Sequence, residues 1–171
     1  MDIEAVIAQH GDYLLKVAYL YVKNEATAED IVQDVFISFY QKQGQFRQES
    51  SLRTYLVKMT VNRSHDYLRS WKSKRLTLFE KITGKATYQT PEKEVLIKTS
   101  KRELVEALFT LAVQYREVLI LYYFEDMSTV EIAMFVSCPE STVRTRLQRA
   151  RKQLAATIDD YDWEVLRHES I

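Results

Sequence analysis

Arginine, serine and threonine side chains are concentrated near the C-terminal end of the sequence, in the segment STVRTRLQRARKQL. A guanidinium can donate two parallel hydrogen bonds to a guanine edge, and hydroxyl groups can bind phosphate oxygens. Apolar residues recur in this segment at helical spacing, at Val143, Leu147, Ala150 and Leu154. The segment therefore predicts an amphipathic helix that buries this stripe and directs its arginines elsewhere, namely Arg144, Arg146, Arg149 and Arg151.

A shorter helix, TVEIAMFV, is predicted immediately before that segment, across the turn SCPE. Ser128, with Glu131 three residues later, forms a capping box for its start. A short helix, a tight turn and a second helix rich in Arg and Thr are typical of a helix-turn-helix, whose second helix enters the major groove. We expect base-edge contacts from Glu140, Ser141, Thr142, Arg144 and Thr145, and phosphate contacts or internal ion pairs from Arg146, Arg149, Arg151 and Lys152. A basic amphipathic helix in an ordinary bundle is the alternative.

A second basic block occupies residues 44–76, with eight basic and two acidic residues. Four aromatic residues are interleaved with these charges: Phe46, Tyr55, Tyr67 and Trp71. Stacking surfaces beside positive charge suit unpaired bases, although aromatic residues at helical spacing also build cores. The block therefore predicts either a single-stranded nucleic acid surface or an ordinary apolar face.

Neither catalysis nor metal binding is indicated. His65 and Asp66 are adjacent, but no nucleophile motif or phosphate loop accompanies them. Glu29, Asp30 and Asp34 fan around one expected helix, which favours a solvated face or a protein-docking surface over a metal site. We expect no enzyme activity, no metal, no cofactor and no small-molecule substrate.

Composition predicts an all-α fold. The 171 residues include only 3 Gly and 2 Pro, whereas sandwiches and barrels need repeated turn residues. Gly84 and Pro91 lie in a polar stretch without sustained periodicity. We predict two small helical domains, at residues 1–75 and 92–155, joined by a linker at 76–91 and followed by an acidic tail at 156–171.

The N-terminal domain is expected to contain three helices. The first would bury Ile3, Val6, Ile7, Leu14, Val17, Ala18 and Tyr21. The second would begin at a Thr27–Asp30 capping box, and the third at Ser50 and Ser51, with Leu52, Tyr55, Leu56, Met59, Tyr67 and Leu68 turned inward. In the C-terminal domain, one helix is expected around Val95–Leu111 and an apolar one over Tyr115–Phe124.

Two long stretches resemble a known family. TAEDIVQDVFISFYQ, followed by FRQESSLRTYLVKMTVNRSHDYLR, resembles region 2 of the extracytoplasmic-function (ECF) sigma factors of bacterial RNA polymerase. The segment from Tyr115 to Leu154 resembles their region 4. The resemblance implies a specificity subunit that joins core polymerase and directs initiation at a small set of promoters.

The resemblance also implies roles for individual residues. The polar face of the second helix would dock on the clamp helices of the polymerase β′ subunit, with the β subunit as a further partner, through Asp30, Gln33 and Asp34. The basic helix would capture and melt the −10 element, with Asn62 and Arg63 near a flipped-out base and further contacts from Arg53, Tyr55, Lys58 and Arg69. The −35 element would be read by Ser141, Thr142, Arg144, Thr145, Arg146 and Arg149.

The acidic N-terminus and the shortness of the longest apolar stretch, Val118–Phe124, predict a cytoplasmic protein. The resemblance implies an anti-sigma partner, membrane-associated, that holds the protein inactive. The rival interpretation is a stand-alone helix-turn-helix regulator that binds duplex DNA without polymerase. That rival would not account for the basic-aromatic block or for the face that carries Asp30.

Overall fold

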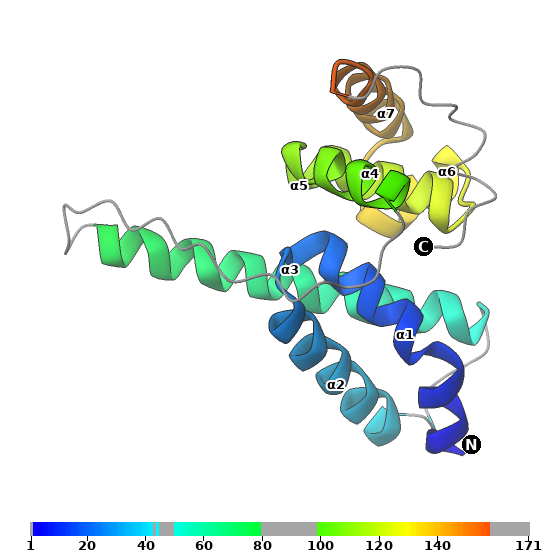
Figure 1. Cartoon of the computed structure of the whole chain (residues 1–171). Helices are drawn as coiled ribbons and strands as arrows, with labels where there is room; N and C mark the ends of the chain where they lie inside the picture. Colours follow the sequence, from blue (N-terminus) through cyan, green and yellow to red (C-terminus); the bar gives the residue numbers. More distant parts are fainter. Residues whose placement is uncertain (1, 43, 45–49, 80–98, 158–171) are drawn as a thin grey trace. The chain divides into compact units, whose positions relative to one another are not determined.

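The computed structural model describes residues 2–42, 44, 50–79 and 99–157, and all regular structure within them is helical (Figure 1). The chain separates into two compact units, residues 1–93 and 94–171. The expected all-α fold class is confirmed. Most of the expected tail, and most of the expected linker, lie outside the described residues.

The N-terminal unit is a three-helix bundle made of α1 (Ile3–Val22), α2 (Glu25–Lys42) and α3 (Leu52–Phe79). Each of these helices packs against the other two. Leu14 of α1, Phe39 of α2 and Leu56 of α3 are all at most 1 % exposed. Two buried hydroxyls on α3 donate to carbonyls one turn earlier, Thr60 to Leu56 and Ser64 to Thr60. These bonds allow polar side chains to share an otherwise apolar core.

The start of α2 differs from the sequence-based expectation. The helix begins at Glu25, and the Asn24 side chain accepts hydrogen bonds from the Thr27 backbone N–H, at 2.8 Å, and from the Thr27 hydroxyl, at 2.9 Å. The predicted Thr27–Asp30 capping box is therefore wrong. An Asn side chain satisfies an orphan N–H as well as a Thr does, and here it lies one turn earlier.

The start of α3 was predicted correctly, because the Ser51 hydroxyl accepts from the Thr54 backbone N–H at 3.1 Å. The predicted inward face is wrong in part. Val57 and Val61 are buried, whereas Tyr67 is 37 % exposed. Figure 1 shows the cause: the later turns of α3 continue beyond the ends of α1 and α2, so nothing in the bundle covers this part of the helix. The helix also runs four residues past position 75.

The C-terminal unit contains α4 (Thr99–Thr110), α5 (Val113–Leu119), η2 (Ile120–Phe124), α6 (Thr129–Val136) and α7 (Glu140–Ala155). The predicted stripe of α7 is confirmed, since Val143, Leu147, Ala150 and Leu154 are at most 3 % exposed. This stripe packs against α5 and α6. The helix expected at Tyr115–Phe124 begins at Val113 and changes to a π-helix at Ile120. Val95 and Leu96 lie outside the described residues.

We predict that Asn24→Ala lowers the free energy of unfolding of the N-terminal unit by about 1 kcal/mol, because the first turn of α2 loses its side-chain cap. Urea denaturation followed by circular dichroism measures this change. The control is Gln41→Ala, an exposed position of the same helix, for which the change should stay within about 0.5 kcal/mol. Equal effects of the two substitutions would contradict the assignment of Asn24 as the cap.

Candidate nucleic-acid interface

The turn between α6 and α7 has the geometry of a helix-turn-helix. The predicted capping box at Ser128 and Glu131 is confirmed, with both reciprocal hydrogen bonds present. Ser137 closes α6 in the left-handed region at φ 55°, and the Cys138 backbone N–H donates to the Ala133 carbonyl. Pro139 then occupies the N-cap of α7. The short reversal between these two caps fixes the direction in which α7 leaves α6.

A polar link joins α6 to α7 beside this turn. The Glu140 carboxylate accepts from the Thr129 hydroxyl at 2.6 Å and from Nε and Nη2 of Arg144 at 2.9 and 2.7 Å. The Thr129 bond first, and then the Arg144 bonds, lower the pKa of the Glu140 carboxyl. Arg144 is thus held by its Nε edge, while its side chain remains 70 % exposed.

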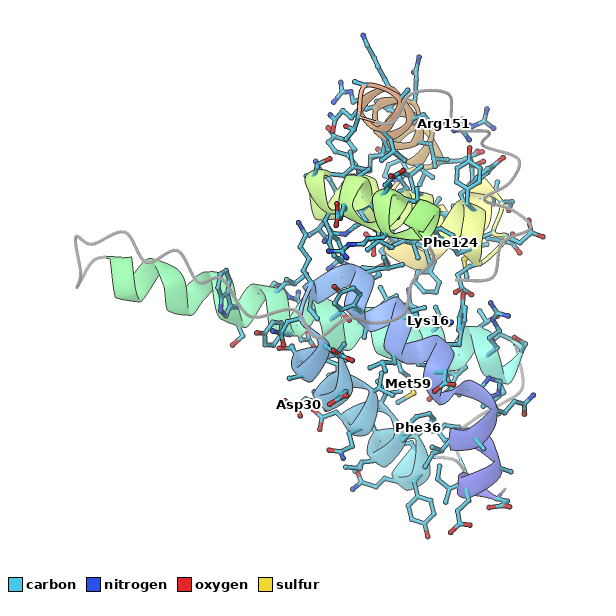
Figure 2. The ribbon with its side chains drawn as sticks, viewed as in Figure 1. Lys16, Asp30, Phe36, Met59, Phe124 and Arg151 are labelled. Carbon is cyan, nitrogen blue, oxygen red and sulfur yellow. The ribbon has the colours of Figure 1, made fainter. Side chains whose placement is uncertain are left out.

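The arginines of α7 fall into two groups. Arg144 has Glu140, and Arg151 donates to the Tyr123 hydroxyl at 2.9 Å and lies over the Tyr122 ring, 5.3 Å from its centroid. Arg146 and Arg149 have no acidic partner among the residues that the structure describes; they line a hollow next to the start of α5. Figure 2 shows Arg151 on α7 and Phe124 at the end of η2.

The remaining predicted −35 residues lie on the open side of α7. Ser141 and Thr145 are exposed, and the Thr145 hydroxyl donates to the Ser141 carbonyl at 2.9 Å. Thr142 is half-buried. Successive residues turn by 100° around a helix, so Ser141, Thr145 and Arg149 form one row that points away from the buried stripe.

The predicted docking residues of α2 form one exposed patch. Asp30, Gln33 and Asp34 are all exposed. Figure 2 shows Asp30 pointing away from the bundle, whereas Phe36 on the same helix points into it. Asp34 also approaches Arg63 of α3 at 3.7 Å, so the docking patch adjoins the predicted −10 residues. The sequence could not reveal this pair, because it depends on how α2 packs on α3.

The structure gathers most, but not all, of the predicted −10 residues. Lys58, Asn62 and Arg69 follow one face of α3, and Tyr55, which packs edge-on against Phe39, lies on the same side. The Arg69 guanidinium also forms an ion pair with Asp66.

Arg53 lies on the other side of α3. Its guanidinium is 4.0 Å from the centroid of the Tyr13 ring on α1. It is also close enough to His10 to lower the pKa of that imidazole, after the larger effect of burial. The structure therefore separates Arg53 from the face that carries Asn62.

The structure also bears on metal binding and on membrane insertion. Among the described residues, no cluster of three His, Cys, Asp or Glu side chains could hold a metal ion. None of the described helices is both long and apolar enough to span a membrane.

Comparison with known families matches both units. Residues 6–74 match "Sigma-70 region 2", and residues 101–154 match "Sigma-70, region 4". The chain is 31 % identical to RNA polymerase sigma factor SigV of Bacillus subtilis and 32 % identical to YlaC of the same organism. Each of these alignments covers at least 90 % of both chains. It is 25 % identical to ECF RNA polymerase sigma factor SigW of that species, over 91 % of this chain and 88 % of SigW.

Solved structures share the fold. The sigma factor RpoE from Bartonella quintana, solved in complex with the anti-sigma factor NepR, is 21 % identical and superposes with a TM-score of 0.72 over 92 % of this chain and 98 % of that one. CnrH, solved with the cytosolic domain of CnrY, is 24 % identical with a TM-score of 0.60, over 90 % of this chain and 85 % of CnrH.

Sigma-70 regions 2 and 4, in this order and over this length, define a sigma factor rather than a stand-alone regulator. The chain belongs to the extracytoplasmic-function group of RNA polymerase sigma factors. Such a protein binds core RNA polymerase and directs promoter-specific initiation; sigma factors are transcription initiation factors, not enzymes.

We predict that Thr129→Val raises the pKa of the Glu140 carboxyl toward its ordinary value, because the largest stabilising bond to the charged form is lost. A carboxyl with a lowered folded-state pKa stabilises the fold above its unfolded pKa, and this contribution is lost as pH falls through the folded-state pKa. The variant should therefore lose less stability than the unmodified protein upon acidification below about pH 4.3.

Carboxyl-detected NMR titration and thermal melts between acid and neutral pH measure both effects. The matched control is Ser128→Ala, which should raise the pKa of Glu131 and leave that of Glu140 unchanged, since Ser128 lowers the Glu131 pKa. A shift of Glu131 but not of Glu140 in the Thr129 variant would refute the interhelical bond.

Proposed function

We propose that the patch Asp30, Gln33 and Asp34 docks this chain on core polymerase, that α3 captures the −10 element, and that α7 reads the −35 element. One observation supports this assignment most directly. The exposed faces of α2, α3 and α7 carry the residue types that region 2 and region 4 chemistry requires, and each is opposite a well-packed apolar stripe. The clamp helices of the β′ subunit are the proposed site for the α2 patch, with the β subunit as a further contact.

Docking through α2 would leave α3 available for DNA. Carboxylate and amide side chains on an exposed helix face offer acceptors to basic residues of a partner. Arg63 adjoins this patch through Asp34, with side chains 46 % and 59 % exposed. We assign Arg63 to the −10 surface beside Asn62, where a guanidinium would bind the phosphate next to an extruded base.

The −10 surface combines charge with a side-chain amide. Lys58 and Arg69 provide positive charge along one face of α3, and Asn62 lies between them with an exposed amide that can donate and accept. Tyr55 borders this face. Capture of an unpaired base requires both base-edge contacts and backbone charge, because extrusion costs a few kcal/mol.

The −35 surface depends on the orientation of Arg144. Glu140 occupies the Nε edge of the guanidinium, which leaves the terminal edge for a bidentate pair with guanine. Ser141, Thr142 and Thr145 present hydroxyls to phosphate or base edges at the start of α7, while Arg146 and Arg149 provide charge.

Regulation and location follow from the same proposal. RpoE was solved in complex with the anti-sigma factor NepR, and CnrH in complex with the cytosolic domain of CnrY. We propose that an anti-sigma factor, anchored to the membrane or free, likewise holds this chain inactive, and that the chain acts in the cytoplasm without catalytic activity of its own.

Run-off transcription of fragmented genomic DNA, with core polymerase and with or without the chain, tests the proposed function. New transcripts with shared upstream elements support it, and their absence would overturn it.

We predict that Asp34→Arg abolishes binding to core polymerase, because the substitution reverses the charge of the docking patch and repels Arg63. Size-exclusion co-elution with core, and fluorescence anisotropy of a labelled chain, measure the loss. Asp12→Arg, an exposed reversal on α1, is the control and should bind core normally. Normal binding by the Asp34 variant would remove α2 from the docking surface.

We also predict that Asn62→Ala slows promoter melting about tenfold or more, because losing hydrogen bonds to an extruded base costs about 1–3 kcal/mol. Fluorescence of 2-aminopurine placed in the −10 element follows the melting. Arg53→Ala should instead lower the melting temperature of the protein and slow promoter melting less, because Arg53 contacts Tyr13. The opposite ranking would return Arg53 to the centre of the −10 surface.

A further inference from the structure

The recognition helix α7 has two unlike flanks. Toward α6, the link from Thr129 through Glu140 holds Arg144. Toward α5, there is a hollow of about 290 Å³ whose lining residues come from two helices: Gln114, Tyr115, Ser141, Thr142, Thr145, Arg146 and Arg149. A helix seated in the major groove, which is about 12 Å wide, has a sugar-phosphate backbone on each side. Each flank of α7 therefore faces one backbone.

The hollow is cationic. None of its seven lining residues is acidic, and two of them are arginines. Arg144 and Arg151 are engaged by Glu140 and Tyr123, whereas Arg146 and Arg149 have no acidic partner among the described residues. Two like charges at three-residue spacing on one helix repel each other, unless an anion lies between them.

The opposite wall of the hollow supplies neutral donors. Gln114 is exposed and Tyr115 is half-buried, both in the first turns of α5. The structure gives neither the Gln114 amide nor the Tyr115 hydroxyl a hydrogen-bond partner within the residues it describes. Thr142 and Ser141 add hydroxyls from the first turn of α7. Amide, hydroxyl and guanidinium donors around one concave surface are the set that a phosphodiester accepts from.

We propose that this hollow binds a backbone phosphodiester of the promoter duplex beside the −35 element, with Gln114 and Tyr115 as DNA-contacting residues outside the recognition helix. The inference rests on the proposed −35 role of α7. The hollow clamps the strand on the α5 side, while the Glu140–Arg144 pair addresses base edges from the α6 side. The phosphate contact sets the depth and register of α7 in the groove and carries no sequence preference of its own.

Holoenzyme reconstituted from core polymerase and the full chain tests this site on a promoter duplex recovered by run-off transcription. Gln114→Ala and Tyr115→Phe should each weaken duplex binding about two- to tenfold, by the same factor for the promoter and for duplexes with single changes in the −35 element. Arg144→Ala should instead lose discrimination at one base pair. Gln153→Ala, an exposed glutamine of α7 that does not line the hollow, should bind normally.

Neutral methylphosphonate linkages, placed one at a time along the −35 duplex, locate the bound phosphate. For the unmodified chain, a neutral linkage at the phosphate bound in the hollow, which flanks the element, should lower affinity. In Arg146→Ala a neutral linkage at that phosphate should have no further effect, whereas neutral linkages at other contacted phosphates should lower affinity as before. Co-elution with core and far-ultraviolet circular dichroism confirm that each variant folds and docks.

The outcomes separate the two proposals. Failure of run-off transcription would overturn the proposed function, and this site with it. Specific transcription with hollow variants that bind like the unmodified chain, or a methylphosphonate profile that Arg146→Ala leaves unchanged, would overturn the hollow alone. If Tyr115→Phe changed the affinity for duplexes altered at one −35 base pair only, the hollow would also be overturned, because Tyr115 would then contact a base and not a phosphate.

Discussion

Burial of one apolar stripe on α7 is the constraint on which the DNA-facing surface depends. Val143, Leu147, Ala150 and Leu154 are almost fully enclosed against α5 and α6, which fixes the rotation of the helix about its axis. A slip of one residue would turn the helix by 100° and expose an apolar row. This rotation buries no polar side chain, because the opposite row consists of the exposed residues Ser141, Thr145 and Arg149. The same packing that stabilises the unit therefore selects which side chains DNA can reach.

Polar contacts set the finer geometry that apolar packing leaves open. Apolar contacts are non-directional, so they fix the rotation of a helix better than the orientation of a long guanidinium. In α7 the directional contacts come from outside the helix: Glu140 is oriented by Thr129 of α6, and Arg151 by Tyr123 of the π-helix η2. Glu140 and Tyr123 thereby orient Arg144 and Arg151, whereas Arg146 and Arg149 have no acidic partner among the described residues.

Sequence periodicity predicted the parts of the structure that depend on one helix at a time. The α7 stripe and the Ser128 capping box follow from local spacing, and both were predicted correctly. The errors arise where a second element decides. Asn24 caps α2 one turn before Thr27, by accepting from the Thr27 backbone N–H; Tyr67 has inward spacing but lies beyond the helices that could cover it. The Asp34–Arg63 pair and the hollow at Gln114 join segments that are 29 and about 30 residues apart, so no local pattern indicates them. Membership of the family was predictable because it depends on long ordered motifs.

The net charge of the chain is zero, but acidic and basic side chains are concentrated on different surfaces. The ion pairs Asp34–Arg63, Asp66–Arg69, Arg102–Glu106 and Glu140–Arg144 lie at the surface, where an ion pair contributes about 0–1 kcal/mol. The Asp34–Arg63 pair, with both side chains about half exposed and 3.7 Å apart, belongs to this class. Since so little stability is tied up in the pair, a partner that binds Asp34 need overcome only a small free energy to separate it from Arg63. The freed guanidinium then lies beside Asn62, at the surface assigned to DNA. Weak pairing at this boundary lets one small bundle carry an acidic and a basic surface side by side.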